Sequence, residues 1–149
     1  MRESKARPRA VRAAGFTLIE IMVVVVIIGL LAAMIAPNIM EQLDRAEINR
    51  ARQDIRQIET ALNLYRLDNY RYPSTDEGLQ ALVTNPGETV APNWKPGGYL
   101  RSLPQDPWNR PYQYANPGQR GEFDIYTLGA DGQEGGEGND ADIGNWDLG

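Results

Sequence analysis

The chain has 149 residues, 23% of them charged, and a formal net charge of −5 at pH 7. It contains no cysteine and no histidine, which excludes disulfides, catalytic thiols, a Ser-His-Asp triad and metal sites built from thiolate or imidazole. The first 15 residues hold five of the 15 basic residues and one of the 20 acidic ones, so the remainder has a formal charge of −9. An acidic surface of this kind argues against nucleic acid as a partner.

A long apolar segment follows this basic leader. No charged residue lies between Ile21 and Ala36, and residues 16–40 would span roughly 37 Å as a helix, enough to cross a bilayer core of about 30 Å. Because the basic leader lies on one side only, the positive-inside rule predicts a cytoplasmic N-terminus and an external C-terminal part. Pro37 predicts a kink or local melting of this helix. A secretory signal cut after Ala36 is the alternative, although its apolar stretch is normally shorter.

Glu20 lies just inside the start of the apolar segment, where a carboxylate is costly. A position in the first turns of a helix reduces that cost, and the side chain could simply reach the membrane edge. Intramembrane carboxylates are nevertheless functional candidates. If the chain is cut after Gly15, the new amino group of Phe16 becomes a cation four residues away. In a packed array, Glu20 of one subunit could then pair with the amino terminus of another.

After residue 40 the pattern becomes amphipathic and predicts a helix with one buried face. Ser74 and Glu77 form a capping-box pattern that predicts a short helix through Leu82. The expected fold is α+β, with a long N-terminal helix, half membrane-spanning and half amphipathic, packed on a small C-terminal antiparallel sheet. The buried stripe of the helix is Ile48, Ala51, Ile55, Ile58, Leu62 and Tyr65, and the expected strands are Tyr99–Leu100, Tyr112–Tyr114 and Phe123–Leu128.

Residues 128–146 combine acidic side chains with glycines. Calcium takes six to eight oxygen ligands, several of them backbone carbonyls, and this segment suits it better than the stricter octahedron of magnesium. An EF-hand is not supported, because Gln133 and Gly135 stand where that loop has Asp or Asn. A disordered acidic tail has a similar composition, but Ile143 and Trp146 would anchor this one to a domain. The segment therefore predicts a calcium loop.

Gly15-Phe16-Thr17-Leu18-Ile19-Glu20 resembles the processing motif of the type IV pilin superfamily. The resemblance implies cleavage after Gly15 by a prepilin peptidase, methylation of the Phe16 amine and an assembly role for Glu20. Further blocks at residues 67–73, 77–82, 103–108 and 111–114, together with the final loop, resemble the major pseudopilins of type II secretion, the general secretion pathway protein G family.

This resemblance implies a pilin-like fold divided into a leader (1–15), a transmembrane and assembly helix (16–39) and a periplasmic head (40–149). It implies a non-catalytic subunit in the inner membrane of a Gram-negative bacterium that forms a homopolymer in the periplasm and drives export of folded proteins across the outer membrane. The implied partners are other copies of the chain, minor pseudopilins, the prepilin peptidase, the inner-membrane assembly platform of type II secretion and membrane lipid. The implied Ca²⁺ ligands are the side chains of Asp131, Asp140 and Asp142 and the carbonyl of Leu128.

Three other functions remain open on the sequence. The chain could be a subunit of a true type IV pilus, or a calcium-binding periplasmic protein tethered to the membrane as a monomer. It could also be a tethered periplasmic enzyme that uses Asp106 and Asp124 for acid–base chemistry. Acidic residues in loops and strands are more commonly solvated or capping groups.

Overall fold

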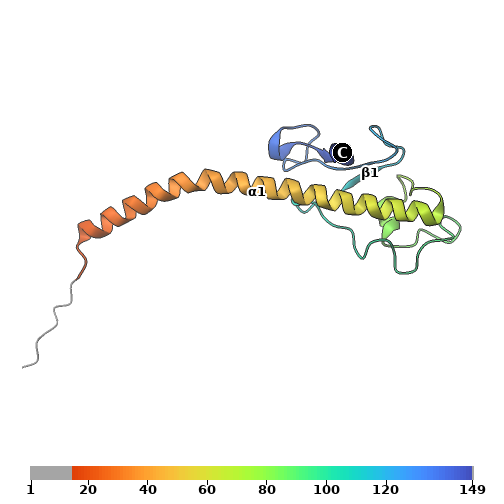
Figure 1. The fold of residues 1–149 in the computed structure, drawn as a ribbon, viewed down its shortest axis with the longest axis horizontal. Coiled ribbons are helices and arrows are strands. Elements are labelled where there is room, and N and C mark those ends of the chain that lie inside the picture. The colour runs from red at the N-terminus through yellow and green to blue at the C-terminus, as the bar shows by residue number, and fades with distance from the viewer. Residues whose placement is uncertain (1–14, 149) are drawn as a thin grey trace, which may run out of the picture. The chain divides into compact units, whose positions relative to one another are not determined.

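The computed structural model describes residues 15–148, with the backbone alone described at residues 36 and 37. A long helix, α1 (Leu18–Asn69), precedes short 3-10 helices and strands (Figure 1). These are η1 (Leu79–Leu82), β1 (Gln113–Ala115), β2 (Asp124–Thr127), η2 (Gly138–Asp140), β3 (Ile143–Gly144) and η3 (Asn145–Asp147). The chain forms two compact units, Met1–Met40 and Glu41–Gly149, each described below by itself. Residues 1–14 of the predicted leader lie outside the described residues, and the division into leader, membrane helix and head stays a prediction.

The first unit contains the apolar beginning of α1. Large apolar side chains point outward on every face of the helix, and those from Leu18 to Ile35 are between 46% and 81% exposed. This part of α1 is long and apolar enough to cross a membrane, and none of it is buried inside the protein. The helix runs without a break through residue 37, so the local melting predicted there is not present. Water is a poor solvent for such a surface, which therefore requires lipid or other protein as its surroundings.

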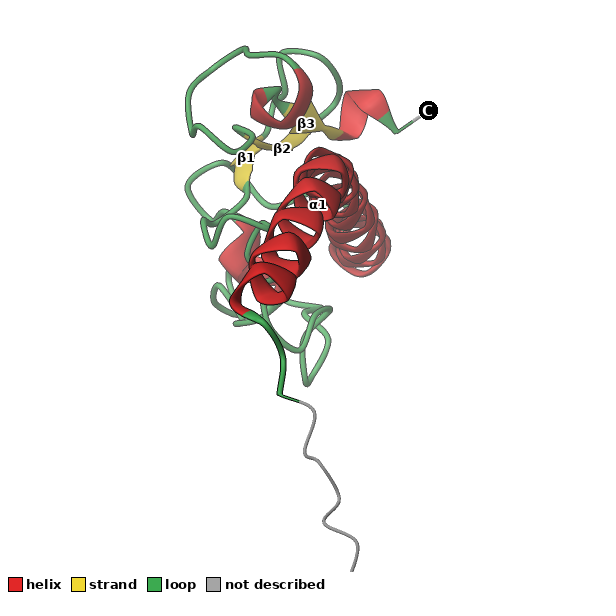
Figure 2. Ribbon diagram, turned by 90° about the vertical axis from the view of Figure 1, so that its left-hand side faces the viewer, coloured by secondary structure: helices red, strands yellow, loops and turns green. Residues whose placement is uncertain are grey.

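The second unit, residues 41–149, is called the head below. The predicted stripe of α1 forms one side of its core: Ala51, Ile55, Ile58, Leu62 and Tyr65 are completely buried, and Ile48 packs against them. Side chains from η1, the sheet and the intervening loops complete the core, namely Leu79, Leu82, Leu100, Tyr112, Phe123, Ile125 and Ile143. The prediction of a long helix packed on a small antiparallel sheet is confirmed (Figure 2).

The sheet of the head has the order β1-β2-β3, with both pairs antiparallel. β1 and β2 lie within a residue of the predicted strands Tyr112–Tyr114 and Phe123–Leu128. Tyr99–Leu100 was predicted as a strand and is not one, because both of its amides donate to the Leu82 carbonyl and close a turn against η1. β3 was not predicted, since a strand of two residues, Ile143 and Gly144, is too short to show alternation and exists through its pairing with β2.

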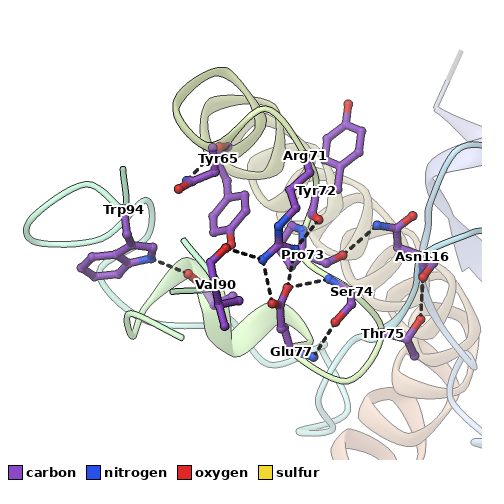
Figure 3. A network of polar contacts seen from close by, with 12 residues as sticks. Tyr65, Arg71, Tyr72, Pro73, Ser74, Thr75, Glu77, Val90, Trp94 and Asn116 are labelled. Atoms are coloured by element: carbon purple, nitrogen blue, oxygen red, sulfur yellow. Dashed lines mark hydrogen bonds and ion pairs between the residues drawn. The ribbon is translucent and has the colours of Figure 1, made fainter. Parts of the chain in front are cut away.

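A polar cluster holds the chain where it leaves α1 (Figure 3). Helix α1 ends at Asn69, and Tyr70 adopts a left-handed conformation with φ 59° that turns the chain out of the helix. Arg71 donates to both carboxylate oxygens of Glu77 at 2.7 Å and to the Val90 carbonyl at 2.8 Å. The predicted capping box is present, since the Ser74 amide donates to Glu77 and the Glu77 amide donates to the Ser74 hydroxyl. The Glu77 carboxylate and the Arg71 guanidinium thereby join the end of α1, the capping box and the loop at Val90.

Glu77 should make the head sensitive to acid. The hydrogen bonds from Arg71, followed by those from Ser74, lower the pKa of Glu77 below its ordinary value of 4.5. A carboxylate with a lowered pKa stabilises the folded state above its unfolded pKa, and this stabilisation is lost as the pH falls below 4.5 through the folded pKa. We expect Glu77→Gln to destabilise the head by about 1–3 kcal/mol at pH 7 and to reduce the loss of stability between pH 5 and pH 3.

Urea unfolding followed by tryptophan fluorescence measures this, because all three tryptophans lie in the head. Glu88→Gln is the matched control, since Glu88 is exposed. Equal acid sensitivity in the wild type and Glu77→Gln would show that Glu77 does not contribute to it.

Candidate functional site

The predicted processing site lies at the start of the described chain. Gly15 and Phe16 are non-helical and exposed, and Phe16 is 79% exposed. α1 begins two residues later, at Leu18. A protease needs an accessible backbone free of helical hydrogen bonds, and the bond between these two residues meets that requirement. The roles of Gly15 and Phe16 as a cleavage and methylation site stay predictions.

Thr17 and Glu20 bond reciprocally across the first turn of α1. The Thr17 amide donates to Glu20 Oε2 at 3.4 Å, and the Glu20 amide donates to Thr17 Oγ1 at 3.3 Å. This is a capping box, which satisfies two amides that the start of a helix leaves without intrahelical partners. For Glu20 only a partner from another subunit was predicted, and the contact with Thr17 was not. The Thr-x-x-Glu spacing was the signal that could have identified it.

The second predicted site is the loop that joins β2 to β3. The Ala130 amide donates to the Asn139 carbonyl at 2.9 Å, and the Asp142 amide donates to the Gly135 carbonyl at 3.1 Å. Gly129 and Gly136 have positive φ of 63° and 82°, and a Cβ on either would collide with the carbonyl of Asp140. These two glycines therefore let the two halves of the loop approach closely. The segment is a folded loop with internal hydrogen bonds and not an extended tail.

The predicted ligands have different surroundings within this loop. Asp131 and Asp140 are exposed, and Asp131 Oδ1 accepts the Gln133 amide at 3.0 Å. Asp142 is half-buried: its Oδ2 accepts the Gly135 amide at 3.0 Å, whereas its Oδ1 is buried without a hydrogen-bond partner. Leu128, which would contribute its carbonyl, is half-buried directly after β2.

The loop fits an oxygen-liganded cation in its chemistry. All of the candidate donors are hard oxygens, and a buried carboxylate oxygen without a partner, Asp142 Oδ1, is a group that a cation would satisfy. Within residues 15–148, however, no three His, Cys, Asp or Glu side chains form a group that could hold a metal ion. The structure thus brings the two halves of the backbone together without gathering the carboxylates of Asp131, Asp140 and Asp142 around one point.

Asp106 and Arg110, which were not predicted as supports of the loop, hold its beginning. Asp106 is 1% exposed and accepts the hydroxyl of Thr127 and the amides of Trp108 and Arg110. Its ion pair with Arg110, 3.5 Å between Oδ2 and Nε, orients the guanidinium, which donates to the Gly129 carbonyl. A buried carboxylate needs such partners, and here they join the end of β2 to the turn at residues 106–110.

Asp106 and Asp124 do not have the arrangement expected of a catalytic pair. Asp124 is 5% exposed and accepts the amides of Gln119 and Arg120, with 2.7 Å between its Oδ2 and the Gln119 nitrogen. Both carboxylates thus cap turns in their own part of the chain. General acid–base work requires a group that can reach a substrate proton. The oxygens of Asp124 are directed at backbone amides, and those of Asp106 are directed at backbone amides, the Thr127 hydroxyl and the Arg110 guanidinium.

Comparison with known families and proteins gives a consistent result. Residues 38–146 match the family model described as "Type II secretion system (T2SS), protein G". Residues 11–36 match the prokaryotic N-terminal methylation motif. The family resemblance predicted from the sequence motifs is therefore confirmed.

Individual relatives agree with the family model. The type II secretion system core protein G of Pseudomonas aeruginosa is 59% identical over 134 residues, which cover 89% of this chain and 94% of the relative. Its counterpart in Vibrio cholerae is 54% identical over 134 residues, covering 90% and 92%. The crystal structure of the major pseudopilin from the type 2 secretion system of enterohaemorrhagic Escherichia coli superposes with a TM-score of 0.65 at 44% identity, covering 75% of this chain and 96% of that one.

The capping box at the start of α1 can be tested by removing its hydroxyl. We expect Thr17→Val to destabilise the first turn by about 1 kcal/mol, because the Glu20 amide loses its acceptor. Amides of residues 18–22 should then exchange about five-fold faster in hydrogen exchange of the full chain in detergent micelles. Thr17→Ser retains the hydroxyl and should exchange like the wild type. Unchanged exchange in Thr17→Val would show that the cap does not contribute.

Proposed function

Because this chain belongs to the type II secretion system protein G family, we propose that it is the major structural subunit of a periplasmic filament, the pseudopilus, that drives export of folded proteins across the outer membrane. The observation that carries the proposal is the pairing of an apolar helix, exposed on every face, with a carboxylate in its first turn. The family is one of structural subunits and not of enzymes.

Two surroundings can accept the apolar part of α1, namely the inner membrane and the helices of other copies. Lipid tails are about as apolar as neighbouring Val and Ile side chains, so transfer from lipid to a helix bundle yields little hydrophobic free energy. Assembly therefore needs a polar contact that favours the filament and an external source of energy. The inner-membrane assembly platform of type II secretion would supply the energy, and Glu20 is the candidate for the polar contact.

Processing and assembly are linked through the new amino terminus. A prepilin peptidase would cut between Gly15 and Phe16, leaving a cation at the start of α1 that is then methylated. In the single subunit, the Glu20 carboxylate accepts the Thr17 amide within its own helix. In the filament, it would accept the charged amine of a neighbouring Phe16, and a charge-assisted contact in an apolar environment is stronger than a neutral one. This exchange of partners would set the register between subunits.

The loop from residue 128 to residue 142 is the proposed calcium site. Leu128 would contribute its carbonyl, and Asp131, Asp140 and Asp142 would contribute carboxylates. The unpartnered Asp142 Oδ1 supports this assignment. Asp131 and Asp140 are exposed, and in turning toward a cation Asp131 would give up only the hydrogen bond from the amide of the exposed Gln133. Bound calcium would draw like charges together and cross-link the two halves of the loop. A head without cysteine has no disulfide to do so.

The proposed function can be tested in cells that carry a prepilin peptidase and the secretion machinery. The intact mass of the protein from membranes should correspond to a chain that begins at Phe16 and carries one extra methyl group. Glu20→Leu should be processed normally and lower the yield of sheared filaments about 10–100-fold, because the amine of the neighbour loses its partner. Glu88→Gln, an exposed change in the head, should assemble like the wild type.

Two other results would point elsewhere. A chain that still begins at Met1 and never assembles would favour a tethered monomer. Filaments that extend outside the cell at the native level of expression would favour a type IV pilus.

Calcium binding can be tested on the full chain in detergent micelles by thermal unfolding. At a calcium concentration 100 times its Kd, the wild-type head should be stabilised by about 2.7 kcal/mol relative to EGTA. Asp142→Asn removes a ligand charge with little change of shape and should lose most of this stabilisation. Asp76→Ala, an exposed carboxylate outside the loop, should keep it. A wild-type melting temperature that does not respond to calcium would contradict the proposed site.

A further inference from the structure

The first turns of α1 in the head have little apolar attachment to the rest of it. Leu43 is 54% exposed and Ile48 is only partly buried, so the fully buried stripe begins at Ala51. Residues 41–50 are nevertheless the part of the helix that connects the core of the head to the apolar segment along the chain. Any order in this stretch beyond the intrinsic stability of the helix must come from polar contacts.

In the described part of the chain, side chains from two distant segments make such contacts. Asn139 Nδ2 donates to Asp44 Oδ1 at 3.1 Å and to Glu47 Oε2 at 3.2 Å. One amide nitrogen has two hydrogens, so it can serve both carboxylates and separate two like charges on one helix face. The opposite amide orientation would place an oxygen against two anions, which fixes the orientation of Asn139. Trp108 Nε1 adds a bond to Glu47 at 3.2 Å.

Both contacts originate in the calcium loop or its support. The Asn139 carbonyl accepts the Ala130 amide, so Asn139 closes the loop next to the candidate ligands Asp131 and Asp140. Trp108 is linked to the loop through Arg110, whose guanidinium lies 5.8 Å from the indole ring and donates to the Gly129 carbonyl. The loop is therefore connected to α1 by two sets of contacts, a direct one through Asn139 and an indirect one through Arg110 and Trp108.

We propose that Asn139 couples the loop to residues 41–50 of α1, so that calcium bound in the loop also orders the helix where the head joins the apolar segment. The inference rests on the proposed calcium site and adds a positioning residue that itself needs no contact with the ion. Without calcium, repulsion among the acidic side chains would open the loop, and the Asn139 amide would lose its hydrogen bonds to Asp44 and Glu47. Residues 41–50 of the helix would then be less ordered. Calcium would thereby control the stiffness of the helix as well as the stability of the head.

Hydrogen exchange of the full chain in detergent micelles, with 1 mM calcium or with EGTA, measures loop and helix separately. In the wild type we expect calcium to slow exchange about five-fold or more in both residues 129–142 and residues 41–50. In Asn139→Ala the slowing should persist in the loop and fall below about two-fold in the helix. The double variant Asp44→Ala, Glu47→Ala removes the acceptors of the same contact on the helix and leaves the loop unchanged. It should likewise retain the slowing in the loop and lose it in the helix.

Gln133→Ala is the matched control, because it removes an exposed amide from the same loop and should retain both effects. Calcium protection of the loop without protection of residues 41–50 in the wild type would overturn the coupling. Helix protection that persists in both Asn139→Ala and the double variant would also overturn it. If calcium protects neither segment, the proposed calcium site fails and the coupling fails with it, and the loop peptides distinguish that case from the others.

Discussion

The constraint on which the rest of the structure depends is that one continuous helix carries two patterns of apolar side chains. From Leu18 to Ile35 they face every direction and are exposed, whereas from Ala51 to Tyr65 they lie on one buried face. The head can cover only the second pattern, because a single small sheet has one face to offer. The first pattern has to be covered by something outside the chain, either lipid or other copies of the chain.

The head contains long loops and no disulfide to hold them in place. It uses polar groups that each join segments distant in sequence. Arg71, paired with Glu77, also donates to the Val90 carbonyl, and the buried Asp106, paired with Arg110, accepts the Thr127 hydroxyl at the end of β2. The final loop belongs to the same scheme, with Asn139 joining it to α1 and a proposed cation joining its halves. When one partner of such a pair is removed, the other stays buried without a hydrogen bond. Single substitutions at these residues should therefore destabilise the head strongly.

Features that depend on neighbours in sequence were predicted correctly. The stripe from Ile48 to Tyr65 and the Ser74 to Glu77 capping box both follow from spacings of three or four residues, and the structure shows both. The same local rule applied to Thr17 and Glu20 would have found their capping box. β2 was predicted because alternation over a few residues, here Phe123 to Leu128, is also local.

By itself the sequence determined the membrane-length helix, the buried stripe and the family, because these depend on composition and local periodicity. Tertiary structure alone decided that Tyr99–Leu100 forms a turn on the Leu82 carbonyl, that Ile143–Gly144 forms a strand, and that Asn139 meets α1. Each of these is a choice of partner made across many residues, 95 in the case of Asn139 and Asp44. A hydrogen bond requires its two groups to be placed within a few tenths of an ångström, and only the packing of the whole head brings such distant groups together.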